Sequence, residues 1–263
     1  MKNFYKVFVA IIFISFYNNG YSQLWKRTRY EVMFITGANS VFTDLGGGAT
    51  KRKPLFLDFD YQGVRPIGGI GARYKLKRDM ALKLDMVFAY YRADDAWTLD
   101  PGRHNRGVGV KGPLFDFGVR YEYSVIKERL GRRYALIYFR GGRNFSFAYV
   151  NTYFFVGLGS FWFSPRVNTG NGWQLATYNN FTRTEARFKK YSHIQVSIPF
   201  GVGFKYAINR EWKLALEIAA RKTFTDYLDH LSDNYSAGDD YYAFFEINII
   251  KRLKTARSGL PKF

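Results

Sequence analysis

Residues 194–221, IQVSIPFGVGFKYAINREWKLALEIAAR, contain two runs in which apolar residues alternate with polar or small ones. A tight polar turn joins the runs, so the pattern predicts a β-hairpin with two distinct faces. The apolar face ends beside the turn in Tyr206 and Trp212. Its other members are Val196, Ile198, Phe200, Val202, Phe204, Leu214, Leu216, Ile218 and Ala220. The opposite face carries glycine and charge, including Gly201, Gly203, Lys205, Lys213, Glu217 and Arg221.

The alternation by itself fits two environments. A sheet between a protein core and water has the same period as a strand between lipid and a barrel interior. The positions of Tyr206 and Trp212 favour the second, because amphipathic aromatic rings are enriched where a membrane meets water. Each run is also about long enough to cross hydrocarbon as a tilted strand.

The composition of the chain suits a membrane barrel. Its 263 residues are enough for one barrel, and aromatic residues make up 20% of them, with 26 Phe and 21 Tyr. This is more than a soluble core usually needs and suits a surface that faces lipid and headgroups. The chain has no cysteine, which excludes disulfides, thiolate metal sites, cysteine nucleophiles and a lipid anchor on cysteine.

Residues 1–22 predict a secretory signal peptide. Lys2 and Lys6 precede and flank the apolar run VFVAIIFISFY, and small residues lead to a cleavage site after Ser22. The apolar run is too short to span a bilayer as a helix, and no other run of helix-spanning length follows. If the exported chain crosses a membrane, we therefore expect a closed β-barrel, which leaves no backbone group unpaired in lipid.

The whole chain predicts an all-β fold, an eight-stranded antiparallel up-and-down transmembrane barrel. The expected strands are 30–39, 66–76, 82–90, 114–123, 150–161, 194–206, 212–221 and 241–250. Long and short connections alternate between them, which is typical of outer-membrane barrels with short periplasmic turns and long outer loops. The expected organisation is a barrel over residues 23–250 and a basic periplasmic tail over 251–263, with both termini periplasmic. Residues 124–149 are interpreted as one extended turn, although two segments within them would also suit an extra hairpin.

The inward face of the expected barrel carries nearly balanced charges. Its predicted ion-pairing residues are Arg73, Lys83, Asp85, Asp116, Arg120, Glu217 and Glu246. A water-soluble, lipocalin-like barrel also has eight alternating strands, but it needs the large apolar face inside. Here the charged face is also the glycine-rich face, which fits a tight lumen. Because eight strands leave room only for side chains, we expect a paired and filled interior rather than a pore.

The formal net charge of +19 falls mostly on the expected periplasmic side. We expect a docking rim there, formed by Lys127, Arg129, Arg132, Arg133, Arg140, Arg143, Lys251, Arg252 and Lys254. Such a concentration of charge attracts acidic partners. Contact with anionic headgroups of the inner leaflet is the simpler interpretation, and a docking surface for a periplasmic protein is the more specific one. Nucleic acid is not an expected partner in that compartment.

Three segments carry a resemblance to a known family: SVFTDLGG at 40–47, IPFGVGFKYAINREWKLALE at 198–217, and RKTFTDYLDHLSDNY at 221–235. In these segments the chain resembles the PorG-type outer-membrane β-barrel family of the type IX secretion and gliding machinery. The last segment, with Asp226, Tyr227 and Asp229, is the most specific. The resemblance implies an integral outer-membrane protein that is not an enzyme. It also implies contact with a periplasmic ring formed by a lipoprotein and its partner.

Two other function classes stay open. A lipid-modifying enzyme would need a catalytic group at the outer rim, and the histidines are His104, His193 and His230, all in expected loops. His230 lies near Asp229 and Ser232 in sequence, a weak signal that an ordinary polar loop also explains. A passive stabilising barrel or adhesin is the third class. The acidic residues of 223–240 lack the ordered ligand pattern of an EF-hand, so no metal or cofactor is predicted.

Overall fold

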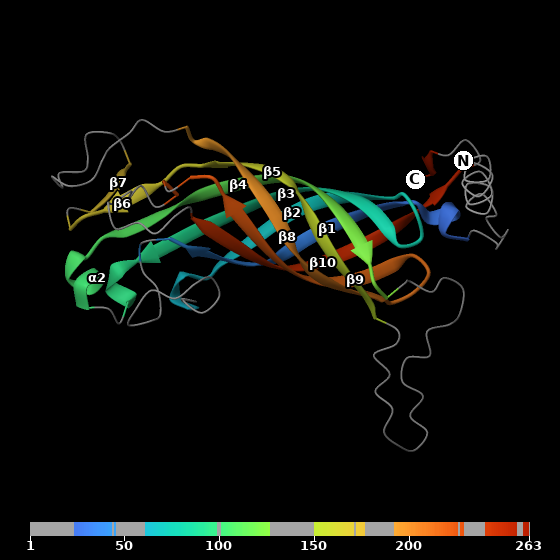
Figure 1. The fold of residues 1–263 in the computed structure, drawn as a ribbon, viewed down its shortest axis with the longest axis horizontal. Coiled ribbons are helices and arrows are strands. Elements are labelled where there is room, and N and C mark those ends of the chain that lie inside the picture. Colours follow the sequence, from blue (N-terminus) through green and yellow to red (C-terminus); the bar gives the residue numbers. More distant parts are fainter. Residues whose placement is uncertain are drawn as a thin grey trace, which may run out of the picture.

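A computed structural model describes residues 24–43, 45, 61–98, 101–126, 150–170, 172–176, 192–225, 227–228, 240–256 and 260–262. Its principal feature is a closed antiparallel β-barrel (Figure 1). The barrel strands are β1 (Tyr30–Phe42), β2 (Arg65–Lys75), β3 (Met80–Asp94), β4 (Gly109–Ser124), β5 (Asn151–Phe163), β8 (Ile194–Ala207), β9 (Trp212–Thr223) and β10 (Tyr241–Thr255). The sequence prediction of an eight-stranded barrel is thereby confirmed.

Each barrel strand pairs with the strands that precede and follow it among these eight. The order is β3-β2-β1-β10-β9-β8-β5-β4, and pairing of β3 with β4 closes the ring. Pairing of β1 with β10 joins the first and the last barrel strand, from Tyr30 opposite Leu253 to Phe42 opposite Tyr241. Closure satisfies the backbone hydrogen bonds that an open sheet would leave at its edges.

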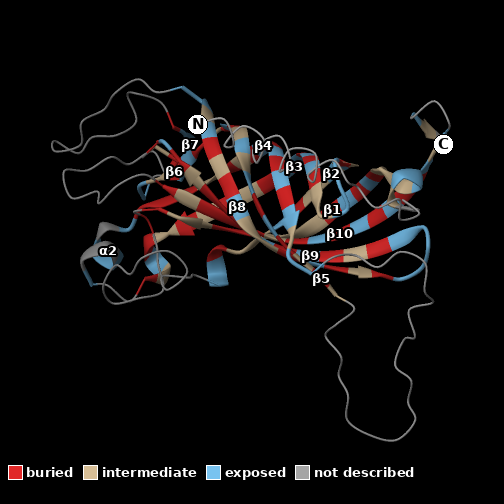
Figure 2. Ribbon diagram, turned by 45° about the vertical axis from the view of Figure 1, so that its right-hand side comes forward, coloured by how far each residue is buried: buried red, intermediate tan, exposed pale blue. Residues whose placement is uncertain are grey.

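Residue alternation decides which side chains face the lumen (Figure 2). In β3 the buried Lys83 and Asp85 alternate with Leu84 and Met86, which are 47% and 45% exposed on the outer wall. In β5 the outward Leu158 is 67% exposed, whereas Phe161 on the inner face is buried. The apolar stripes predicted from the sequence thus lie on the outside, and the charged stripes lie inside.

Several strands extend further than the sequence predicts. The segment 92–112 is polar and predicts a loop, but β3 continues to Asp94 and β4 begins at Gly109. This paired stretch buries Ala93 and Val110 on the inward face. Their neighbours Arg92 and Lys111 are polar, so the alternation of a strand is hard to recognise in the sequence. Between the strands lie η4 (Asp95–Trp97) and α2 (Pro101–Arg106). No helix in the described part of the chain is long and apolar enough to cross a membrane.

Short elements extend the barrel at both ends. At one end β6 (Arg166–Asn168) pairs with β4, and β7 (Trp173–Leu175) pairs with β6, within a segment that the sequence predicts to be a loop. At the same end η3 (Tyr61–Gly63) contacts β1 and β3. At the other end, which carries the short turns after β2 and β8, lie η1 (Leu24–Thr28) and β11 (Pro261–Lys262) (Figure 1). Strand β10 runs past Ile250, the predicted end of the barrel, and β11 pairs with its last residues.

Two predictions fall outside the described residues. They are the signal peptide over 1–22 and most of the segment 124–149, with its alternative of an extra hairpin. They stay predictions.

Candidate functional site

The middle of the lumen is filled by a network of buried ion pairs around Arg120 of β4. Its guanidinium donates to both carboxylate oxygens of Asp85 on β3. It also lies 3.1 Å from Glu217 Oε2 on β9 and 3.1 Å from Glu246 Oε1 on β10. Lys83 Nζ donates to Glu217 Oε2 at 2.8 Å from the opposite wall. Four strands are thus held together across the barrel by charge-assisted hydrogen bonds.

A second group of ion pairs fills the lumen nearer the short turns. Arg73 bridges Glu31 Oε2 at 3.0 Å and Glu122 Oε1 at 2.8 Å. Lys75 and Lys213 both lie against Glu31, and Lys205 Nζ lies 2.6 Å from Glu122 Oε2. A hollow of about 20 Å³ lies between these groups, which is room for about one water molecule.

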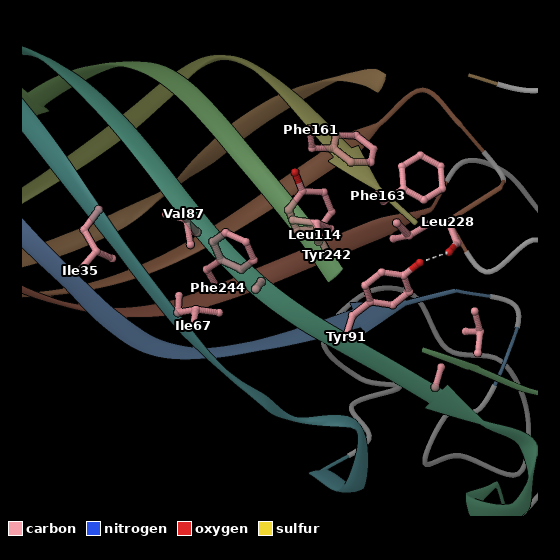
Figure 3. Packing of buried hydrophobic residues seen from close by; sticks show 14 of the residues in the cluster. Ile35, Ile67, Val87, Tyr91, Leu114, Phe161, Phe163, Leu228, Tyr242 and Phe244 are labelled. Atoms are coloured by element: carbon pink, nitrogen blue, oxygen red, sulfur yellow. Dashed lines mark hydrogen bonds between the residues drawn. The ribbon is translucent and has the colours of Figure 1, made fainter. Parts of the chain in front are cut away.

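Aromatic and aliphatic side chains fill the lumen toward the loops (Figure 3). Tyr242 joins the two regions, because its hydroxyl donates to Asp116 Oδ2 while its ring packs edge-on against Phe161 at 5.3 Å. Beyond it, Tyr91 Oη donates to the Leu228 carbonyl oxygen at 3.0 Å. Leu228 N donates in turn to Asp240 Oδ2 at 3.0 Å, so the start of the last long connection is fastened to the barrel mouth.

The predicted lumen residues all lie in this interior. Arg73, Lys83, Asp85, Asp116, Arg120, Glu217 and Glu246 are each 2% exposed or less. Asp116 lies 3.2 Å from Arg221 Nε. Sequence reasoning missed Tyr153, whose hydroxyl donates to Glu217, and Tyr242. The alternation places both on the inward face, but nothing in the sequence says which carboxylate each hydroxyl reaches.

The barrel end with the short turns forms a basic rim. Its exposed cations, called the rim cations below, are Lys26, Arg27, Lys77, Arg78, Arg210, Lys251 and Lys254. Among the described residues at this end, Glu211 is an exposed carboxylate and Asp79 is half-buried. The interior ion pairs are nearly balanced, so the positive charge of this end is on its surface, where it attracts acidic groups.

The predicted docking residues are distributed unevenly. Lys251 and Lys254 are exposed rim cations, and Lys251 Nζ lies 5.7 Å from the ring centroid of Trp212. Arg252 is buried, because its position on β10 continues the inward series, and it donates to the carbonyl oxygens of Asn209 and Arg210. It therefore fastens the β8–β9 turn. Lys127, Arg129, Arg132, Arg133, Arg140 and Arg143 lie outside the described residues.

The described residues offer little for catalysis or metal binding. His104 is exposed on α2, and His193 Nδ1 lies 3.0 Å from the Phe163 carbonyl oxygen next to β5. His230, Asp226 and Asp229 lie outside the described part. Tyr227 N donates a hydrogen bond to Thr225 Oγ1. No group of three or more His, Asp or Glu suited to a metal ion occurs among the described residues.

A model of a family described as a domain of unknown function (DUF6089) matches residues 143–249. No curated protein matches the chain. Neisserial surface protein A is similar in structure, with 9% identity, a TM-score of 0.44, and 85% of this chain and 96% of that one covered.

Two further solved structures are similar. A major outer membrane protein from Thermus thermophilus has 12% identity and a TM-score of 0.42, with 85% of this chain and 99% of that one covered. The E. coli outer membrane protein W has 13% identity and a TM-score of 0.37, with 86% and 98% covered.

Proposed function

We propose that this protein is an outer-membrane docking barrel that holds a periplasmic partner at its basic rim. With the resemblance of the chain to PorG-type barrels, the proposed partner is the lipoprotein-containing ring of the type IX secretion machinery. The observation that supports this most directly is the number of exposed cations at one barrel end. The rim cations lie at one barrel end, whereas the charged side chains of the lumen are paired with one another.

The outer wall supports insertion in a membrane. Each of the eight barrel strands exposes at least one large apolar side chain on that wall, among them Ile70, Leu158 and Leu216 at 62%, 67% and 52%. Water-soluble monomers rarely expose a continuous apolar surface of this extent. Outward aromatic residues border the band, with Tyr30, Tyr74, Tyr123, Tyr206 and Trp212 near the short turns, and Tyr90, Trp162 and Tyr241 near the loops. Such girdles are typical of outer-membrane barrels at both interfaces.

The filled lumen supports a structural role. Conduction would need an open path, but Arg120, Lys83 and their carboxylate partners occupy the middle of the barrel. A rigid, closed barrel keeps the rim cations at fixed positions on its end. A surface of this kind suits a partner with an acidic face, and the attraction weakens as salt shortens the Debye length.

Charge reversal at the rim tests the proposal. The K77E/R78E variant changes two exposed rim cations, and the R166E/K222E variant reverses the same number of charges near the loops as a matched control. Each tagged full-length protein is extracted from native membranes, and co-purifying proteins are identified by mass spectrometry. We expect the rim variant to lose the periplasmic ring lipoprotein while the control retains it.

Other outcomes would overturn the docking role. Equal recovery of the partner with both variants would show that these cations do not hold it. The rim variant could instead keep the same co-purifying proteins but lose its preference for anionic vesicles. That result would assign the rim to lipid headgroups. Normal secretion in a strain lacking the gene would favour a passive barrel. An altered acyl pattern of lipid A in that strain would favour a lipid-modifying enzyme.

A further inference from the structure

The outer wall contains a hollow of about 630 Å³ across β1, β2 and β3. Two rows of side chains that run across the strands form its sides. One row continues from Phe34 through Ile70 and Met86 to Phe117. In the other row, Ala72 lies between Val32 and Leu84, and the floor is closed by the Gly71 backbone and Met33. The hollow exists because β2 places only a methyl group where its neighbours carry large side chains.

The hollow has a polar end. Its second row continues from Val32 to Lys251 and then to Trp212, which begins β9 directly after the turn 208–211. Lys251 is exposed, and its ammonium lies beside the Trp212 ring. The hollow therefore runs from an apolar middle wall to a cation and an indole at the short-turn rim. Lysine and tryptophan are the side chains that meet lipid headgroups at a membrane interface.

We propose that this hollow binds one phospholipid with an anionic headgroup. One acyl chain would lie between the two apolar rows over Ala72, and the phosphate and headgroup would lie at Lys251. The inference rests on the membrane insertion proposed above. The volume is within the range of pockets that hold a single small ligand. Lys251 favours an anionic over a zwitterionic lipid, because the lysine attracts the phosphate of either lipid but repels the ammonium of a zwitterionic headgroup.

Three variants of the full-length protein test the site. A72F fills the hollow from an exposed outward position, and K251Q removes the cation. V156F adds bulk at an outward position of β5, which does not line the hollow, and serves as the matched control. Each protein is inserted in nanodiscs of phosphatidylglycerol and phosphatidylcholine in equal amounts. It is then released into mild detergent, and native mass spectrometry counts the retained lipids.

We expect the wild type and V156F each to retain one phosphatidylglycerol, and A72F to bind this lipid with about tenfold lower occupancy. K251Q should retain both lipids equally. Full occupancy in A72F, or phosphatidylcholine retained by the wild type, would overturn the lipid site. So would protein from native membranes whose hollow holds the acyl chain of another protein instead of a phospholipid. Migration of unheated samples on gels reports barrel folding separately. Failure of the wild type to enter nanodiscs at all would contradict membrane insertion itself, whereas an inserted barrel without the lipid would contradict only this site.

Discussion

The ring of Tyr153 on β5 lies against Gly203 on β8, in the space that a side chain at position 203 would occupy. A Cβ atom on Gly203 would lie less than 3.0 Å from Tyr153 Cζ and Tyr153 Oη, closer than a real Cβ atom approaches its neighbours. This packing lets the hydroxyl reach Glu217, to which it donates a hydrogen bond. It also places the ring 3.6 Å below Lys205 Nζ. The inward glycine is thus required for an aromatic residue to join the ion-pair network.

Replacing Gly203 with valine should therefore destabilise the barrel. The new side chain must displace the Tyr153 ring and its hydrogen bond to Glu217, so we expect a loss of about 1–3 kcal/mol in the free energy of unfolding. Urea titration of protein folded in lipid vesicles measures it. Gly68 to alanine is the matched control, because a Cβ there meets no atom within 4 Å and should change the free energy little. Equal stability of G203V and the wild type would refute the packing described.

Arg120 should be the least replaceable cation of the lumen. Its loss in R120M leaves Asp85, Glu217 and Glu246 without their shared partner in a buried site. Removal of one partner from a buried ion pair typically costs about 3–5 kcal/mol. The same titration measures the change, and the exposed Arg210 offers a control, since R210Q should stay within about 0.5 kcal/mol of the wild type. A small loss in R120M would show that the network rearranges around the gap.

The hydrogen bond from Tyr91 to the Leu228 carbonyl should hold the chain at the barrel mouth. In Y91F the ring remains but the bond is lost, so we expect about 0.5–1.5 kcal/mol less protection against local opening. Hydrogen exchange of residues 225–228 would measure it, with exchange in β8 and β9 expected to be unchanged. Protection in Y91F equal to the wild type would mean that the Leu228 N to Asp240 hydrogen bond suffices.

Side-chain alternation made the barrel predictable from the sequence. Leu158 between Gly157 and Gly159, and Lys83 between Leu82 and Leu84, each assign a face without any knowledge of neighbouring strands. Strand ends were predicted less well, because Arg92 and Lys111 are polar residues within paired β-structure. Arg252 was misplaced on the surface for the same reason, since basic residues after Ile250 hide the continued inward series of β10.

The sequence did not allow us to predict which charged side chains pair with each other across the lumen. Arg120 contacts Glu246 through a sequence separation of 126 residues, and Lys83 contacts Glu217 through one of 134. Such pairs depend on strand register and on the closing of the ring, which the sequence pattern does not specify. The same holds for the hollow over Ala72, because its depth depends on large side chains that other strands place around it.

The proposed orientation of the barrel, with its apolar stripes in lipid, is tested most directly by L158K in the middle of the outer wall. Leu158 is 67% exposed, so in a water-soluble protein this change would cost almost nothing. A lysine in the lipid-facing wall should instead lower the free energy of unfolding in vesicles by about 2–4 kcal/mol. Ile208, which is 51% exposed in the turn after β8, provides I208K as a control with little loss. An L158K protein as stable as the wild type, and soluble without detergent, would contradict the insertion of the apolar wall in lipid.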